Sequence, residues 1–291
     1  MQLRQLHLEI GQCLAQADIE DPRREAALIL AHFLNLQLSE IYTHSSMELT
    51  QIKIDEIRQA AERRAKREPL AYLVGRVCFM DLEFEVGPGA LVPRPDSEIL
   101  VETAIDVGQA LAVPQLDILD VCTGTGCIGI SLAVHLQRVK RLRHLWLTDL
   151  DSEAAAYAEK NLKIHRLDEQ ATLEIADLFP LDGQQHWDLI VANPPYIASS
   201  VIAALMPEVS VHEPRLALDG GPDGLDFYRR LIAAAADRLN PGGALLLEHG
   251  FDQAEQIKAL FSADQRYRLI PTIIDYGGQP RVTGGYYANS I

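Results

Sequence analysis

The sequence predicts an α/β fold in which a mostly parallel, seven-stranded sheet is covered by helices on both faces and preceded by a small helical bundle. From Leu116 onward, short apolar runs alternate with amphipathic stretches, as expected when helices connect parallel strands. The N-terminal region shows helical periodicity alone. Residues 277–280, Gly-Gly-Gln-Pro, form a hairpin connection between the last two predicted strands, so the final strand should run antiparallel.

Composition limits the classes of protein and partner. The chain has 291 residues, 48% of them hydrophobic, which is enough for a full domain and a smaller companion. A net charge of −15 disfavours direct DNA binding, because the surface should repel a phosphate backbone. We expect a cytoplasmic protein with no membrane partner, since no apolar run reaches about 18 residues and no signal peptide is visible. The four scattered cysteines indicate neither disulfides nor a metal site.

Residues 1–73 are expected to form an N-terminal helical domain for substrate docking. Leu3, Leu6 and Ile10 recur at helical spacing, Pro22 opens a second helix, and Thr50 caps a third. Simple packing against the main domain is the alternative role for this region.

A basic run occupies residues 63–67, Arg-Arg-Ala-Lys-Arg, on the third predicted helix. Acidic residues flank the run on both sides. We expect a solvated helix face here, and a contact patch for an acidic or RNA-bearing partner is the alternative.

Residues 74–95 are expected to form a hairpin linker. Residues 80–86 alternate apolar and acidic side chains, which predicts a half-buried strand. Two prolines then hold Arg94 in a rigid segment, and Asp96 caps a helix that opens the main domain, residues 96–291. Further strands are expected at residues 117–120, 145–148, 172–175, 188–192, 244–247, 268–274 and 282–288, and helices at 128–136, 152–165 and 223–239.

A glycine-rich turn follows the first strand of the main sheet. Residues 124–129 match the pattern G-x-G-x-x-G, and Asp149 closes the next strand. The carboxyl ends of parallel strands are where open α/β sheets bind ligands. Both a nicotinamide dinucleotide and S-adenosylmethionine carry a ribose that Asp149 could bind, so this turn alone leaves the two cofactors open.

Two features favour S-adenosylmethionine. Asp177 closes the third strand, where its carboxylate could accept a hydrogen bond from an adenine amino group. A dehydrogenase would need a proton donor near the substrate hydroxyl, and the fourth strand instead ends in Asn193-Pro194-Pro195-Tyr196.

The sequence from Asn193 to Tyr196 is the strongest indication of function. Neither proline has an N–H, so the strand must end there, and Pro194 biases Asn193 toward an extended conformation. The Asn193 side-chain oxygen and the Pro194 carbonyl are then left at the strand end, where they can accept both hydrogens of a planar NH2 group. The Tyr196 ring could lie against the flat face of that group.

Several separated motifs resemble one family. Residues 120–126 with 193–196 resemble the amino-directed class I methyltransferases, which have a Rossmann-like sheet. Residues 68–75 (Glu-Pro-Leu-Ala-Tyr-Leu-Val-Gly), 91–98 (Leu-Val-Pro-Arg-Pro-Asp-Ser-Glu), 212–215 (His-Glu-Pro-Arg) and 275–277 (Asp-Tyr-Gly) are similar to the HemK/PrmC family of release factor glutamine methyltransferases. The resemblance spans roughly residues 68 to 291.

The resemblance implies methyl transfer from S-adenosylmethionine to the side-chain nitrogen of the glutamine in the Gly-Gly-Gln motif of class-1 peptide chain release factors, the expected protein partner. It places the substrate glutamine on Asn193, Pro194, Pro195 and Tyr196, of which Asn193, Pro194 and Tyr196 are the expected catalytic residues. It places the cofactor on Cys122, Thr123, Gly124, Thr125, Gly126, Asp149, Asp177, Leu178 and Asn193.

One residue departs from the family pattern. The family usually has glycine at the position of Cys122, and a left-handed backbone there would cost a cysteine about 1 kcal/mol. A related enzyme that modifies a glutamine of a large-subunit ribosomal protein also tends to carry cysteine, so this substrate stays open. A DNA adenine methyltransferase stays open as well, as does a module that binds Gly-Gly-Gln loops without turnover.

Four further polar residues lie near the predicted site. His212, Glu213 and Arg215 follow the fourth strand, where Glu213 and Arg215 could contact the substrate loop or brace the structure. We expect His249 to be incidental, because methyl transfer does not need it.

Overall fold

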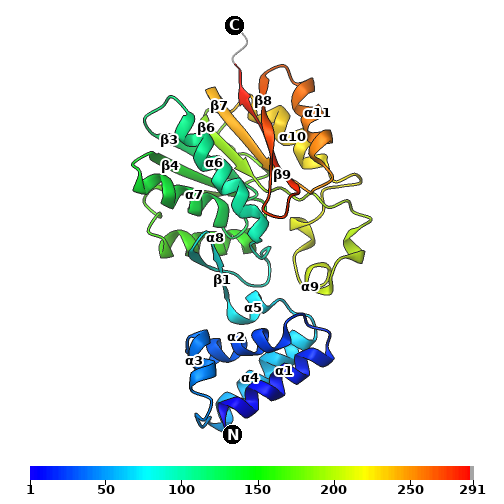
Figure 1. Ribbon diagram of the computed structural model, residues 1–291. Helices are drawn as coiled ribbons and strands as arrows, with labels where there is room; N and C mark the ends of the chain where they lie inside the picture. The colour runs from blue at the N-terminus through cyan, green and yellow to red at the C-terminus, as the bar shows by residue number, and fades with distance from the viewer. Residues whose placement is uncertain (289–291) are drawn as a thin grey trace. The chain divides into compact units, whose positions relative to one another are not determined.

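The computed structural model describes residues 1–288 and contains two compact units (Figure 1). The first unit comprises Met1–Arg76 together with Leu205–His212, and the second comprises Val77–Ala204 and the chain from Glu213 onward. The sequence did not predict that residues 205–212 belong with the N-terminal helices, since they lie in a loop after the fourth strand of the main sheet.

The second unit is built on a seven-stranded sheet of order β5-β4-β3-β6-β7-β9-β8. Its strands are β3 (Leu116–Val121), β4 (Leu142–Asp149), β5 (Ala171–Ile175), β6 (Trp187–Ala192), β7 (Leu239–Glu248), β8 (Tyr267–Ile274) and β9 (Pro280–Tyr287). Neighbours from β5 to β7 pair in parallel, whereas β9 is inserted antiparallel between β7 and β8. The predicted mostly parallel sheet with an antiparallel last strand is therefore confirmed.

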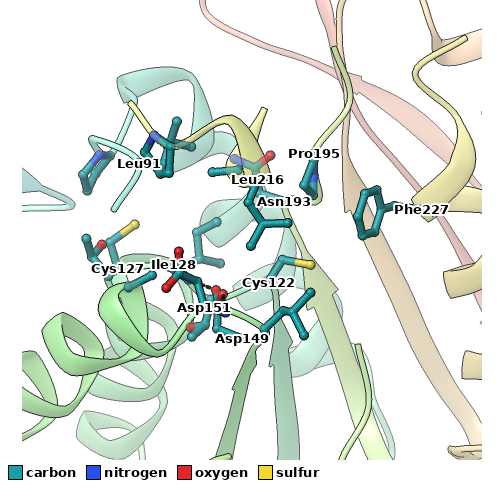
Figure 2. Close-up of a pocket in the computed structure, with 18 of the residues that line it drawn as sticks. Leu91, Cys122, Cys127, Ile128, Asp149, Asp151, Asn193, Pro195, Leu216 and Phe227 are labelled. Carbon is teal, nitrogen blue, oxygen red and sulfur yellow. Dashed lines mark hydrogen bonds between the residues drawn. The ribbon is translucent and has the colours of Figure 1, made fainter. Parts of the chain in front are cut away.

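The strand order reverses between β3 and β6. In this parallel pair Val121 lies opposite Ala192, so the next residues, Cys122 and Asn193, emerge side by side at the carboxyl edge of the sheet (Figure 2). Crevices outside the carboxyl ends of strands at such reversals are the usual ligand sites of open α/β sheets. The fold thus brings the glycine-rich turn and residues 193–196 together.

Two apolar layers enclose the sheet. Alternate residues of β3 enter opposite layers, with Ile118 on one side and Leu119 and Val121 on the other, which explains the continuous apolar runs of the central strands. The first layer packs beneath α6 (Glu98–Ala110), α7 (Cys127–Arg138) and α8 (Ser152–Ile164), and the second beneath α10 (Asp226–Ala235) and α11 (Ala254–Ala263) (Figure 1). Short 3-10 turns occur at Pro95–Ser97, Ile202–Ala204 and Arg215–Ala217.

A hairpin precedes the main sheet, in the range that we expected to be a linker. It consists of β1 (Arg76–Phe79) and β2 (Leu82–Glu85). Phe79 and Phe84 are buried in the same core as α6, with their ring centroids 6.2 Å apart in an edge-to-face arrangement. These aromatic side chains make the hairpin part of the second unit.

The structure corrects three predictions about helices. Asp96 does not cap the helix that opens the main domain, because it lies inside the 3-10 turn Pro95–Ser97 and Ser97 is the N-cap of α6. The helix expected over residues 223–239 covers only Asp226–Ala235, because strand β7 already begins at Leu239 and includes residues 240–243. Helix α11 was not predicted, although Ala254, Ile257 and Phe261 are buried at helical spacing. Within residues 1–288, each helix is too short or too polar to span a bilayer.

The first unit is helical, as predicted. Its helices are α1 (Leu3–Gln16), α2 (Pro22–Leu34), α3 (Leu38–Thr43), α4 (Gln51–Ala65), α5 (Leu70–Val74) and, from the later segment, α9 (Pro207–Ser210). Pro22 occupies the first turn of α2, and the Thr50 hydroxyl accepts a hydrogen bond from the Lys53 N–H at the start of α4. Helices α3 and α5 were missed because so few residues show no clear periodicity. The apolar stripe of α1 packs on α2 and α4 in one core.

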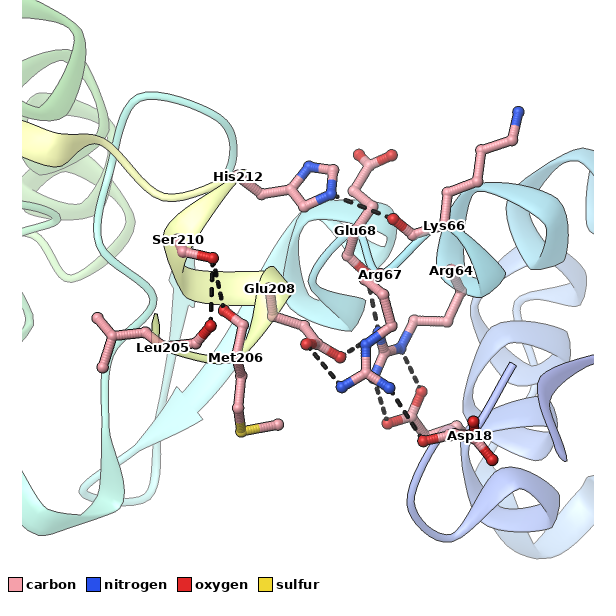
Figure 3. Close-up of polar contacts among 11 residues, drawn as sticks. Asp18, Arg64, Lys66, Arg67, Glu68, Leu205, Met206, Glu208, Ser210 and His212 are labelled. Atoms are coloured by element: carbon pink, nitrogen blue, oxygen red, sulfur yellow. Dashed lines mark hydrogen bonds and ion pairs between the residues drawn. The ribbon is translucent and has the colours of Figure 1, made fainter. Parts of the chain in front are cut away.

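The basic run is not a solvated helix face at Arg64, and the expectation was wrong there. The Arg64 side chain is only 7% exposed and forms ion pairs with Glu25 of α2 at 2.5 Å and with Glu208 of α9 at 2.9 Å. Arg67 also pairs with Glu208, at 2.9 Å (Figure 3). These contacts fasten the later segment 205–212 to the N-terminal helices, which sequence spacing could not reveal.

We expect Arg64→Met to destabilise the full chain by about 3 kcal/mol, because it leaves two largely buried carboxylates without their cation. Urea denaturation followed by circular dichroism measures this change in the free energy of unfolding.

Arg63→Met is the matched control. Arg63 pairs with Glu68 but is more than half exposed, so its loss should change stability by less than about 1 kcal/mol. Equal effects of the two substitutions would contradict a special role for Arg64.

Candidate active site

A pocket opens at the carboxyl ends of β3, β4 and β6 (Figure 2). Of the residues expected to hold the cofactor, those lining it are Cys122, Thr123, Gly124, Thr125, Asp149, Asp177, Leu178 and Asn193. Gly126 does not line the pocket and instead caps the start of α7. Of the residues expected to hold the substrate, Asn193 and Pro195 line the pocket, whereas Pro194 and Tyr196 lie outside its lining.

The glycine-rich turn is fixed from below by Asp120. One oxygen of this buried carboxylate accepts hydrogen bonds from the Thr123 hydroxyl at 2.5 Å and from the Gly129 N–H at 2.9 Å. A Cβ on Gly129 would lie 2.8 Å from the Asp120 side chain, so the third glycine of the motif permits this contact. Burial raises the pKa of Asp120 to about 7, with the two hydrogen bonds opposing the rise.

Two residues of the pocket adopt left-handed backbone conformations. Cys122 has φ of 57°, at the position where the family usually has glycine, and Leu178 has φ of 69°. Each costs of order 1 kcal/mol, and such strain persists only where the surroundings over-determine it. The Thr148 hydroxyl, for example, donates to the Leu178 carbonyl at 2.6 Å.

Asn161 supports the same turn from α8. Its carboxamide bonds both the N–H and the carbonyl of Glu85, as a neighbouring strand would, and donates to the Thr125 carbonyl at 2.9 Å. Asn161 is fully buried. Nothing in its local sequence indicated this role, because its partners lie 76 and 36 positions earlier.

Asp149 presents a carboxylate of fixed orientation to the pocket (Figure 2). Its oxygens accept the Gly124 N–H at 2.7 Å and the Asp151 N–H at 2.9 Å. Each oxygen retains a lone pair, which suits the hydroxyls of a ribose. Burial raises the pKa of Asp149, and the backbone hydrogen bonds oppose that rise.

Across the pocket from Asn193, the residues around Asp177 could bind a flat ring with polar edges. Asp177 is 56% exposed on its side chain and pairs with Arg230 at 2.7 Å. The Leu178 N–H makes no hydrogen bond within residues 1–288. A carboxylate beside a free N–H, with Phe227 also lining the pocket, fits the donor and acceptor edge of adenine. The residues present therefore fit an adenosine-bearing cofactor.

The Asn193 carboxamide is oriented by Ser97. Its Nδ2 donates to the Ser97 hydroxyl at 3.2 Å. Among the described residues, neither Asn193 Oδ1 nor the Pro194 carbonyl accepts a hydrogen bond. Both acceptors thus stay available for a ligand.

Tyr196 is half-buried against the core of α10 and α11, and burial raises the pKa of its hydroxyl to about 12. Its carbonyl accepts a hydrogen bond from the Gln253 amide at 2.9 Å. A Cβ on Gly224 would collide with the same carbonyl, so glycine is required there. Gln253 and Gly224 hold residues 193–196 in place, and sequence reasoning identified neither.

The segment around Arg94 is braced by Glu213. The Glu213 side chain is 1% exposed and lies 2.5 Å from the Arg94 guanidinium, and it also accepts the Val92 N–H. Arg94 lines the pocket, so this ion pair fixes part of the pocket wall. Bracing is therefore the observed role of Glu213.

The other polar residues singled out in the sequence have internal partners. Arg215 is exposed and pairs with Asp219, and His212 belongs to the first unit. Both ring nitrogens of the buried His249 are engaged, by the Gly250 carbonyl at 2.8 Å and the Thr283 hydroxyl at 2.9 Å.

Comparisons with known proteins identify the family of this chain. Residues 5–75 match the model of the PrmC N-terminal domain, and residues 96–221 match the methyltransferase small domain. The chain is 39% identical over 272 residues to a release factor glutamine methyltransferase of Geobacter sulfurreducens, covering 94% of this chain and 92% of that protein. It is also 39% identical over 282 residues to a protein of the same name from Moorella thermoacetica, covering 97% of each.

A solved methyltransferase from Pyrococcus furiosus shares the fold, with a TM-score of 0.51 and 20% identity, over 71% of this chain and 89% of that one. The class I methyltransferase fold and the family resemblance predicted from the sequence are thus confirmed. The chain belongs to the family of release factor glutamine methyltransferases.

Proposed function

We propose that this chain transfers a methyl group from S-adenosylmethionine to the side-chain amide nitrogen of the glutamine in the Gly-Gly-Gln motif of class-1 peptide chain release factors. The names of its relatives support the substrate class. The single structural observation that carries the proposal is the pair of available acceptors, Asn193 Oδ1 and the Pro194 carbonyl, beside a pocket that fits adenosine.

The chemistry depends on alignment. The cofactor, when bound, supplies an electrophilic sulfonium methyl group. A glutamine nitrogen is a weak nucleophile because its lone pair is delocalised, so the protein must hold it in line with that methyl group. Asn193 Oδ1 and the Pro194 carbonyl accept its two hydrogens, which fixes the nitrogen and stabilises the positive charge that develops on it.

The cofactor would be held by both rims of the pocket. Asp149 would bind the ribose hydroxyls, and Asp177 with the Leu178 N–H would bind the edge of adenine. The turn from Cys122 to Gly126 would hold the rest of the cofactor close to Asn193. This assignment follows the order of the strands in the sheet: Asp177 follows β5, Asp149 ends β4, and Cys122 and Asn193 follow β3 and β6.

A large-subunit ribosomal protein is the second candidate substrate, because of one observation. Cys122 occupies a left-handed position where the release factor enzymes usually have glycine, and the enzyme of a large-subunit ribosomal protein tends to have cysteine. Mass spectrometry of both candidate substrates after incubation with enzyme and cofactor decides between them. We expect a mass increase of one methyl group on the release factor only.

The same assay can include duplex DNA as a third candidate substrate and can also measure whether the cofactor is consumed. Methylated DNA would indicate a DNA adenine methyltransferase, which the net charge of −15 disfavours. Binding of the release factor without any methylation would indicate a module that only captures the Gly-Gly-Gln loop.

We further propose that the first unit docks the release factor and that the reaction takes place in the cytoplasm, where translation terminates. The match of residues 5–75 to an N-terminal domain of this family supports a dedicated role for that unit.

Asn193→Ala should lower the rate of methylation by about 10²- to 10³-fold, because one acceptor of the developing charge is lost. Cofactor affinity, measured by calorimetry, should weaken only modestly. The control is Asn240→Ala, which removes a carboxamide bonded to Asp188 at the opposite end of the sheet. Activity of the Asn193 variant near that of the wild type would refute the assignment.

Asp149→Asn should weaken cofactor binding by roughly 10- to 100-fold, because an amide supplies one acceptor where the carboxylate serves two backbone N–H groups and the ribose. Calorimetric titration with S-adenosylmethionine measures the change. Asp106→Asn, on the exposed face of α6, is the control and should bind normally. An unchanged dissociation constant for the Asp149 variant would place the ribose elsewhere.

A further inference from the structure

Glu248 is a buried carboxylate beside Asn193 that the reaction scheme above does not use. It ends strand β7, where Leu247 pairs with Ala192 of β6, so Glu248 lies next to Asn193 across the two strands. The residue is 1% exposed, and its Oε2 has no hydrogen-bond partner within residues 1–288. Burying a carboxylate without a partner for each oxygen costs free energy, so the presence of Glu248 here needs an explanation.

Two polar side chains that influence the Glu248 carboxylate, Ser97 and Asn193, line the pocket. Burial raises the pKa of Glu248, and the polar side chains of Ser97 and Asn193 oppose that rise. Asn193 Nδ2 and the Ser97 hydroxyl are themselves 3.2 Å apart. Glu248 therefore forms one polar cluster with Ser97 and Asn193, behind the part of the pocket wall that these two residues line.

No cation neutralises Glu248 directly in the described chain. The nearby guanidinium, Arg281 of β9, is paired with Asp275 at 2.9 Å and with Asp96 at 3.1 Å. The other charged or titratable groups that face it are Asp96 of the first 3-10 turn, Tyr196, Cys127 of α7 and Tyr228 of α10, whose hydroxyl donates to the Glu248 carbonyl. Burial raises the pKa of Glu248 to about 7.

An ionised carboxylate can select one orientation of the Asn193 amide. A carboxamide presents either its oxygen or its NH2 group on a given side, and the two orientations have nearly the same shape. Ionised Glu248 only accepts hydrogen bonds, so it requires the NH2 group of Asn193 to face inward. Protonated Glu248 can donate, which permits the flipped amide. The flipped amide would present NH2 to the NH2 of the substrate, where no hydrogen bond can form.

We propose that ionised Glu248 is a positioning residue, which acts with Ser97 to hold the Asn193 carboxamide so that Oδ1 faces the substrate nitrogen. This inference rests on the proposed function of Asn193. It assigns to Glu248 no contact with substrate or cofactor. Its effect is on the rate of methyl transfer and on the dependence of that rate on pH.

The test compares wild type with Glu248→Gln in single-turnover methylation of a release factor at saturating cofactor, from pH 6 to 8.5. The wild-type rate should fall on the acid side as a group with a pKa near 7 takes up a proton. Glu248→Gln should lose this acid limb and react about tenfold more slowly than the wild-type plateau, since its amide tolerates both orientations of Asn193. The KM for the release factor should change little.

A second readout does not depend on activity. The side-chain ¹⁵N resonance of Asn193, assigned by its absence in Asn193→Ala, should shift through neutral pH in the wild type and stay constant in Glu248→Gln. Glu248→Gln should also be more stable than the wild type at pH 8. A carboxyl whose pKa is raised by folding destabilises the folded state above its unfolded pKa, and the amide removes that penalty.

Asp188→Asn is the control, a buried carboxylate at the opposite end of β6 that bonds the Asp117 N–H at 2.8 Å. It should keep the wild-type pH profile. An acid limb that persists in Glu248→Gln, with an unchanged Asn193 resonance, would overturn the positioning role. A wild type that methylates no release factor at any pH would instead overturn the proposed function.

Discussion

The alignment of β3 with β6 is the constraint on which the site depends. Both strands are buried on both faces, and their alternate side chains fill two different apolar layers. A slip of one residue would move every side chain of a strand into the wrong layer, so packing holds the register firmly. The neighbouring positions of Cys122 and Asn193 are consequently set by hydrophobic contacts well below the pocket. The geometry of this edge of the sheet is a product of core packing.

The carboxylates around the pocket differ in how their burial is compensated. Asp120 and Asp149 accept backbone N–H groups, and Glu213 faces the guanidinium of Arg94. Each of the three therefore stiffens one part of the wall. Glu248 has weaker compensation and lies beside the Asn193 carboxamide. This contrast separates the carboxylates that brace the pocket wall from the one that lies beside Asn193.

The sequence was sufficient for features that depend on local chemistry. The two prolines after Asn193 predicted where β6 ends, and the glycine spacing predicted the turn between β3 and α7. It was insufficient where partners are distant in the chain. Ser97, Asn161 and Gln253 support the site through contacts 96, 76 and 57 positions away. The burial of Arg64 escaped notice for the same reason, since Glu208 is 144 positions away.

Because residues 205–212 belong to the first unit, the protein cannot be divided into its two units by a single cut in the chain. The chain passes between the two units at Arg76, at Ala204 and again at His212, so three covalent connections join them. Truncation after Arg76 would leave Glu208 without either arginine, and would strand an unsupported loop immediately upstream of Glu213. The catalytic unit is therefore not an autonomous module. Exchange of the N-terminal helices between homologues would have to carry residues 205–212 along with them.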